Sequence, residues 1–434
     1  MFTNKIFFTN KNFLNLLISL IPLSLILGNL ITNINILLVC VFGLTTFKLK
    51  IFKINQKIYP YLIYSFFLYL ILITLLRNLP NLEVNILYKE HIFKSFFFLR
   101  FLIFFLVINK LVEEKCFNIK LFFISCAFFS TILAIDIFIQ VSFGKDLLGY
   151  PILNARPSGF FGDENIAGGY LQKFSLFFIF FFYFLFHSTE NYKTIFFKFL
   201  LFIFFFIAIF LAANRMPSFI YLSSIILFVL IEKKFKILFI IFFLLFTTFI
   251  TVNKYFPEYK KASIRSFYVS SKNIIINSPK LFYFNKIKGK DVEWGSNGYL
   301  VTLNSGVQLW KKNKILGSGL KSFRLNCSYG NNQTCNTHPH NYIIELMLDT
   351  GLLGFILIYS AFIFAIINFF KFYIKSSNLP TRFITMPFFL IIFFEFFPIR
   401  SSGSFFTTNN AVVIFLMLAV LINVSKLDYF ETKL

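Results

Sequence analysis

The sequence predicts an all-α protein that crosses a membrane many times. Of its 434 residues, 58% are hydrophobic, 71 are phenylalanine and only 14% are charged. A mean hydropathy of +0.76 reflects more apolar surface than a water-soluble domain of this length buries. Each span is expected to be a helix, because backbone polar groups inside a bilayer must pair within their own segment.

Hydrophobic runs long enough to cross about 30 Å of hydrocarbon recur along the chain. About twelve are predicted, at 13–28, 30–47, 58–76, 92–109, 118–142, 166–187, 194–213, 216–231, 235–252, 341–369, 383–398 and 411–424. They divide the chain into N-terminal spans in residues 1–252, a polar segment at 253–337 and C-terminal spans in residues 338–434. The polar segment is too long for a bare connector, which indicates a functional or partly folded loop.

Lysines are concentrated in alternate short loops, for example Lys48 and Lys50 in one and Lys233 and Lys234 in another. This pattern places both termini in the cytoplasm and the 253–337 segment outside, in the periplasm if the cell has two membranes. The net charge of +24 then indicates cytoplasmic lysines and attraction to membrane lipids or phosphorylated substrates. No nucleic-acid partner is expected, because the chain has no basic soluble domain.

The residues His338-Pro339-His340-Asn341 close the polar segment and open an apolar run. Proline suits the first helical position, which would put His340 in the first turn, near the positive end of the helix dipole. That setting disfavours imidazolium, so we predict that His340 is neutral and accepts a proton. The alternative is a capping or hydrogen-bonding histidine at a membrane boundary.

Three arginines, Arg156, Arg215 and Arg400, stand at predicted outward ends of spans. Each alone fits a side chain that extends to the membrane interface. As a set they offer rigid donor forks suited to phosphate oxygens. After Arg156, the side chain of Asp163 or Asn165 is expected to cap the next helix.

The acidic residues leave two questions open. Asp163 and Glu164 are adjacent, but no carboxylate lies at a ligand spacing from the histidines, so no metal and no cofactor are predicted. Asp136 and Glu395 fall inside predicted spans, where acids line a polar interior or pair with a base. Such acids suit proton-coupled transport as well as an enzyme.

Two cysteines, Cys327 and Cys335, lie just before the histidines. They form a disulfide or remain free thiols, depending on whether the segment faces an oxidising compartment.

The order of these motifs resembles the O-antigen ligase and O-antigen polymerase family. The resemblance covers residues 150–360 and consists of Arg156-x-Ser158-Gly159 leading to Asn165 and Gly168, Asn214-Arg215, Gly317-Ser318-Gly319, His338-Pro339-His340-Asn341 and Asp349-x-Gly351-x-x-Gly354. This chain departs from the family in Asp163-Glu164, where small or uncharged residues are common.

The resemblance implies a GT-C-like integral-membrane glycosyltransferase, inverting and metal-independent, at the outer face of the bacterial inner membrane. It would move a glycan from undecaprenyl diphosphate to a lipid A–core sugar in a ligase, or to another lipid-linked repeat unit in a polymerase. The implied roles are activation of the acceptor by His340 and diphosphate binding by Arg156, Arg215 and Arg400, with His338, Asn165 and Asn341 in support. A transporter or lipid flippase that uses Asp136 and Glu395 is the competing class, and a non-enzymatic scaffold is a third.

Overall fold

The computed structural model describes residues 10–53, 58–83, 86–153, 156–186, 192–233, 298–326, 337–376, 379–398 and 400–427. Their secondary structure is helical, apart from two isolated β-bridges in the loop after α6. The α-helices are α1 (Asn10–Ser19), α2 (Ile21–Ile26), α3 (Asn29–Phe47), α4 (Ile58–Asn78), α5 (Ile86–Glu113), α6 (Ile119–Phe143), α7 (Ala167–Leu185), α8 (Tyr192–Leu211), α9 (Arg215–Ile231), α13 (Gly298–Lys312), α14 (Ser322–Asn326), α15 (Tyr342–Lys375), α16 (Leu379–Glu395) and α17 (Thr408–Ile422). The 3-10 helices are η1 (Lys48–Phe52), η2 (Leu79–Asn81) and η3 (Gly159–Phe161).

The helices confirm the prediction of an all-α, multi-pass membrane protein. In the described part of the chain, 7 helices are long and apolar enough to span a membrane, and α9 and α17 are shorter apolar helices. The count of twelve spans stays a prediction, because the ninth run, 235–252, lies outside the described residues.

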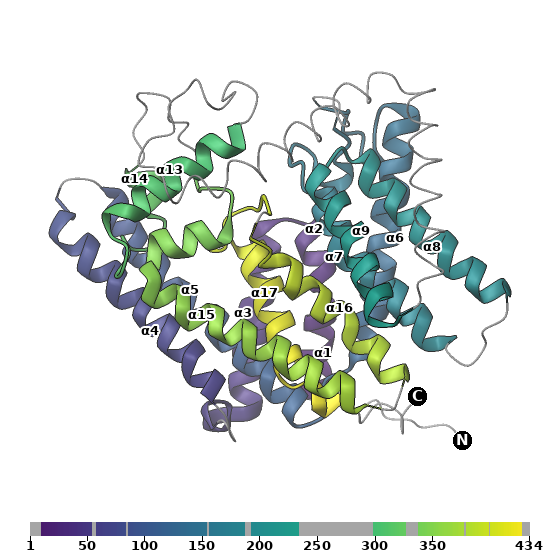
Figure 1. The fold of residues 1–434 in the computed structure, drawn as a ribbon, viewed down its shortest axis with the longest axis horizontal. Coiled ribbons are helices and arrows are strands. Elements are labelled where there is room, and N and C mark those ends of the chain that lie inside the picture. Colours follow the sequence, from purple (N-terminus) through teal and green to yellow (C-terminus); the bar gives the residue numbers. More distant parts are fainter. Residues whose placement is uncertain are drawn as a thin grey trace.

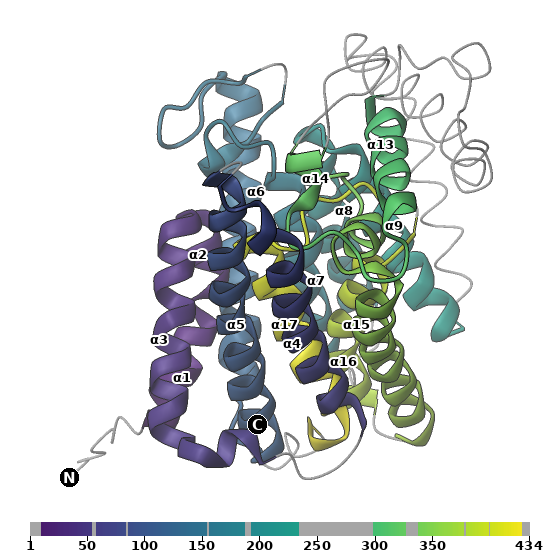
Figure 2. The ribbon, with the colours of Figure 1, turned by 90° about the vertical axis from the view of Figure 1, so that its left-hand side faces the viewer.

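The helices run between two ends of a bundle (Figures 1 and 2). One end, which we call the site end, holds α13, α14 and the start of α15 (Figure 2). The loops 144–166, 212–214 and 396–407 lie at the same end, as do the starts of α3, α5 and α17. The site end therefore gathers polar loops from both halves of the chain.

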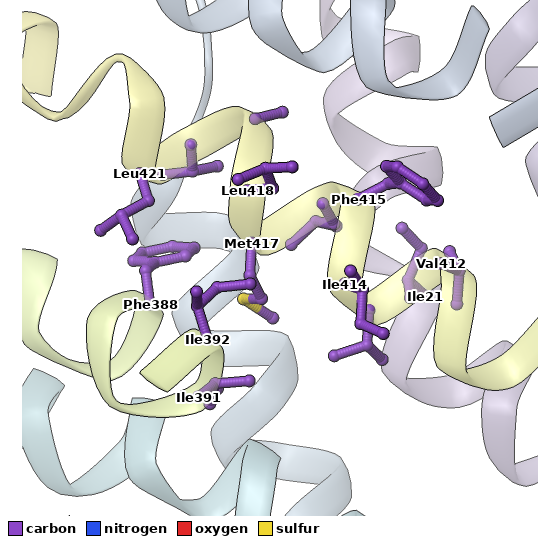
Figure 3. Packing of buried hydrophobic residues seen from close by; sticks show 14 of the residues in the cluster. Ile21, Phe388, Ile391, Ile392, Val412, Ile414, Phe415, Met417, Leu418 and Leu421 are labelled. Carbon is purple, nitrogen blue, oxygen red and sulfur yellow. The ribbon is translucent and has the colours of Figure 1, made fainter. Parts of the chain in front are cut away.

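Helix α17 forms the centre of the bundle. All its residues from Ala411 to Ile422 are buried, and it packs against α3, α5, α15 and α16. Figure 3 shows the side chains of Phe388 and Ile392, on α16, beside those of α17. A helix that is apolar on every side is expected in such a buried position.

Helix α15 is broken at Gly351, where φ is 64° and the backbone leaves helical geometry. Residues 314–319 lie against the break. A Cβ added at Gly351 would lie 2.2 Å from the carbonyl oxygen of Ile315, and one added at Gly317 would lie 2.4 Å from the Gly351 nitrogen. Both positions therefore require glycine, because of close backbone contact and positive φ.

The break leaves backbone groups of α15 without partners in their own helix, and residues 314–319 supply them. The hydrogen bonds run from Ser318 N to Leu348 O (3.0 Å), from Gly319 N to Asp349 O (2.9 Å), from Leu352 N to Lys314 O (2.9 Å) and from Leu353 N to Ile315 O (3.2 Å). The Asp349 carboxylate also accepts hydrogen bonds from the backbone of Lys321 and Ser322. The glycine motifs at 317–319 and 351–354 thus dock the polar segment onto α15.

Candidate functional site

The loop that carries the histidines, residues 338–341, is tied to the loop after α16. Asn341 is the N-cap of α15, and its side-chain oxygen accepts a hydrogen bond from Ile344 N at 3.1 Å. Its amide nitrogen donates to the carbonyl oxygens of Pro398, at 2.9 Å, and Arg400, at 3.1 Å. Asn341 therefore fixes the position of the histidine loop from both sides.

The two histidines of this loop lie next to each other. Their ring centroids are 4.2 Å apart, and both side chains are half-buried. The Thr337 hydroxyl lies 2.9 Å from Nδ1 of His338, and the backbone N–H of Ser402 donates to the His340 carbonyl oxygen at 2.9 Å. The site end thus presents an imidazole pair on a fixed backbone.

The conformation of this loop corrects one prediction. Pro339 does not occupy the first helical position, because α15 begins at Tyr342. His340 lies outside the helix with φ of 56°, a left-handed conformation that strains a non-glycine residue. The bond from Ser402 and the packing of Pro339 against Gly306 of α13 hold this conformation. The prediction of His340 in the first turn is therefore wrong.

Burial, and not the helix dipole, keeps the histidines uncharged. Burial lowers the pKa of His340 below its ordinary value of 6.5, although a separate hydrogen bond between its imidazole and the backbone of Ser402 acts in the opposite direction. The pKa of His338 falls to about 4, first through burial and then through the charges of His340 and Lys321. A neutral imidazole of this kind is able to accept a proton at neutral pH.

Arg400 lies beside the histidine loop in a buried ion pair. Its guanidinium Nη1 is 2.7 Å from Oε1 of Glu395, and Nζ of Lys173 is 3.0 Å from the same oxygen. All three side chains are buried. This arrangement pairs Glu395 with two bases, one of the two interpretations of an intramembrane acid given above. The carboxylate of Glu395 also neutralises much of the charge of Arg400 within the protein.

The loop that carries Arg156 is held by polar residues of α6. Oδ1 of Asp136 accepts a hydrogen bond from Leu147 N at 2.8 Å. Gln140 donates to the Tyr150 carbonyl oxygen at 3.2 Å and accepts from Gly159 N at 2.9 Å. Asp136 therefore supports this loop from within the bundle, and Arg156 itself is exposed at the loop's surface.

Arg215 lies near the Arg156 loop because two helix ends are in close contact. It begins α9, directly after Asn214. A Cβ added at Gly168, in the first turn of α7, would lie 2.7 Å from Cβ of Asn214. The missing side chain at Gly168 thus lets the turn between α8 and α9 approach the end of the Arg156 loop.

The two arginines lie close enough for their charges to interact. Partial burial lowers the pKa of Arg215, and the positive charge of Arg156 lowers it further. Two like charges are therefore held near one another, an arrangement that a bound anion would stabilise.

The described contacts place the predicted site residues in two groups. Arg156 and Arg215 form one, on the side of α6, α8 and α9 (Figure 1). His338, His340, Asn341 and Arg400 form the other, where α15 begins beside the loop after α16. Both groups lie at the site end of the bundle (Figure 2).

The remaining predicted residues have less defined surroundings. The expected side-chain cap of α7 is wrong, because its N-cap is Ile166, without a side-chain hydrogen bond. Asn165 lies half-buried in the turn just before it. In the described part of the chain, no group of three or more histidine, cysteine, aspartate or glutamate side chains is arranged to hold a metal. Cys327 and Cys335 lie outside the described residues.

Lys173 is a site-end residue that the sequence reasoning missed. It lies in α7, inside the apolar run 166–187. A cation inside a span, in a chain with an acid in another span, is the signal that would have indicated the pair with Glu395.

The fold and the site together define a helical, multi-pass membrane protein with arginine and neutral histidine side chains at one end. Residues 199–359 match the family model described as O-Antigen ligase, so this part of the chain is similar to that family. The match runs from α8 into α15 and includes Arg215 and His340. It confirms, over these residues, the resemblance seen in the sequence. No curated protein matches the chain.

Proposed function

We propose that this protein is an O-antigen ligase-like glycosyltransferase with about twelve membrane spans and a GT-C-like arrangement. Its donor would be a glycan on undecaprenyl diphosphate, and its acceptor a lipid A–core sugar hydroxyl. A polysaccharide polymerase of the same family, with a second lipid-linked glycan as acceptor, is the alternative. The division into residues 1–252, 253–337 and 338–434 is part of the proposal.

The observation that carries the proposal is the like-charge pair Arg156 and Arg215. A lipid diphosphate would neutralise both guanidinium groups and accept their paired donors. Arg400 is a weaker candidate for direct contact, because Glu395 already binds it. We assign Arg400 to positioning the histidine loop, whose Asn341 binds its carbonyl oxygen.

His340 would act as the general base. The acceptor hydroxyl attacks the anomeric carbon of the donor sugar, while its proton passes to the neutral imidazole. The bond from the anomeric carbon to the diphosphate breaks, and the lipid diphosphate leaves with the electron pair. Attack from the face opposite the leaving group inverts the anomeric centre. The donor must therefore extend from the arginine pair to the histidine group.

The site end would face the periplasm, with both chain termini in the cytoplasm. This orientation follows from the lysine-rich loops, such as the one that contains Lys48 and Lys50, at the opposite end of α3 from the site.

The test is glycan transfer by purified protein in detergent, where no membrane gradient exists. His340→Gln should reduce transfer about 10²–10⁴-fold, the usual contribution of a general base. Arg156→Gln and Arg215→Gln should weaken donor binding. Lys145→Gln is the matched control, because it removes an exposed cation from the loop that also carries Arg156. Wild-type transfer by His340→Gln, or gradient-dependent movement of the donor without transfer, would contradict the proposal.

The surface polysaccharide of a deletion strain distinguishes the two acceptors. If the protein is the ligase, the deletion strain should have no lipid A–core that carries a polysaccharide chain. Lipid A–core that carries only a single repeat unit would instead identify the polymerase.

A further inference from the structure

A cavity of about 270 Å³ lies at the site end, apart from the arginine pair. It is formed where α5, the start of α3, the start of α17 and residues 320–321 meet. Three cations line it, namely Lys94 and Arg100 of α5 and Lys321 of the polar segment. We propose that this cavity binds the phosphorylated headgroup of a membrane amphiphile.

The positive charge in the cavity is only partly neutralised by the protein. Lys94 pairs with Glu90 at 2.9 Å, and both side chains are well exposed there. Among the described residues, no ion pair is formed by Arg100 or Lys321. The acids whose charge acts on Lys321 are Glu345 and Asp349. Glu345 already accepts hydrogen bonds from Ser404 and Phe405, and Asp349 accepts them from the backbone N–H groups of Ser322 and of Lys321 itself.

Arg100 is held in place by uncharged partners. Its guanidinium donates to the Phe97 carbonyl oxygen at 2.9 Å, to Oδ1 of Asn33 at 3.1 Å and to the Thr408 hydroxyl at 3.2 Å. Its Nε is shielded from solvent and has no hydrogen-bond partner among the described groups. The side chain is thus oriented, while its charge is left for a ligand to neutralise.

Two helix N-termini add to the positive field. Asn29 begins α3 and Thr408 begins α17, and both line the cavity. The N-cap of α3 is Gly28, which has no side chain, and Thr407, the N-cap of α17, forms no side-chain capping hydrogen bond. Backbone N–H groups at such ends, with the helix dipole, favour an anion.

The lining also indicates a ligand with an apolar part. Phe97, Phe98 and Phe406 form part of the wall, and Phe97 is 66% exposed. Neighbouring Phe93 and Phe96 on α5 are exposed as well. An anionic headgroup in the cavity would therefore continue into acyl chains along the aromatic surface of α5.

Lys321 of the cavity is near enough to the histidine group for its charge to act on His338. Neither Arg156 nor Arg215 lines the cavity, so a phosphate bound there would leave the arginine pair available for a different ligand. The inference concerns binding alone, so it stands or fails independently of glycan transfer.

The experiment measures lipid retention by native mass spectrometry of the full chain in detergent. The probes are a phosphomonoester lipid (phosphatidic acid), a zwitterionic lipid (phosphatidylcholine) and inorganic phosphate. The wild type should retain phosphatidic acid in preference to phosphatidylcholine. The double variant Lys94→Gln/Lys321→Gln should bind it about tenfold more weakly, because two charge-assisted contacts are lost. These two lysines are preferred over Arg100, whose hydrogen bonds also hold α3, α5 and α17 together.

The matched control is Lys48→Gln/Lys50→Gln, which removes two exposed lysines at the opposite end of α3. It should retain phosphatidic acid as the wild type does, and melting temperatures of all variants in detergent show whether they fold. Equal binding by the cavity variant and the wild type would overturn the inference, as would equal loss in the control. Tight binding of inorganic phosphate, with no gain from acyl chains, would overturn the assignment to an amphiphile.

Discussion

At the scale of single residues, His338 makes the stability of the protein depend on pH. Its pKa of about 4 lies below its ordinary value of 6.5, so the unfolded chain binds this proton more readily between those values. Stability should therefore fall as the pH drops from about 6.5 to about 4. In His338→Gln that loss should be smaller, which melting temperatures in detergent between pH 7.5 and 4.5 will measure. Parallel curves for the two proteins would show that His338 does not contribute.

The proposed base gives a second prediction at this scale. Burial lowers the pKa of His340 below 6.5, so the imidazole is neutral at pH 7 and above. Transfer should be level from about pH 7 to 8 and decrease only below about 6.5, where His340 becomes protonated. Initial rates in detergent, corrected for loss of folded protein, test this. A rate that rises on acidification would contradict a neutral base.

At the scale of elements, the break in α15 predicts a marked effect at one glycine. In Gly351→Ala the new Cβ meets the Ile315 carbonyl oxygen and the positive φ is strained. The free energy of unfolding should fall by about 3 kcal/mol or more. The control is Gly169→Ala in α7, where the nearest atom is 4.0 Å from the added Cβ, and a change of under about 1 kcal/mol is expected. Comparable melting temperatures for the two variants would show that residues 314–319 do not need this close approach.

The positions of the helices could be read from the sequence, but the break and the loop contacts could not. Apolar runs fix where a span lies, because only helices satisfy the backbone in a bilayer. In the run 341–369, Asp349-Thr350-Gly351 interrupts the hydrophobicity, but small residues in a span also fit close helix packing, so the interruption does not by itself reveal the break at Gly351. Pro339 was misplaced because tertiary hydrogen bonds to Asn341 and Ser402, and not local helix preference, determine the loop.

The sequence predicts which arginine and histidine residues belong to the site. It does not predict which residues they contact, because those contacts depend on the tertiary structure. Arg156 and Arg215 are distant in the chain, yet their charges interact where Gly168 allows close contact with Asn214. Arg400 and Glu395 are five positions apart, a spacing that brings no side chains together on a regular helix. Their pairing depends on the turn that follows α16.

At the scale of the whole molecule, the buried cluster of Lys173, Glu395 and Arg400 joins α7 to α16. Glu395→Gln would leave two buried cations without their carboxylate, and should reduce stability by about 3–5 kcal/mol. Glu114→Gln, which breaks the exposed pair with Lys11, should cost about 0–1 kcal/mol. Denaturation in detergent measures both. An equally small effect at Glu395 would mean that water reaches the cluster.

The proposed orientation can also be tested on the whole molecule. Single cysteines would replace Lys145, at the site end, and Lys50, at the far end of α3, in a background that lacks the five natural cysteines. A membrane-impermeant thiol reagent should label Lys145→Cys in cells with a permeable outer membrane. It should label Lys50→Cys only after the inner membrane is opened. The reverse pattern would place the site in the cytoplasm.

The central position of α17 has a consequence for how the protein is assembled. It follows all the other described helices in the chain, yet α3, α5, α15 and α16 surround it. Helices enter a membrane in the order of their synthesis, so these four must be inserted before the helix at their centre arrives. Until then their inner faces have only lipid or one another as neighbours. Docking of α17 is therefore late relative to these four helices, and the starts of α3 and α17 come together only at that moment.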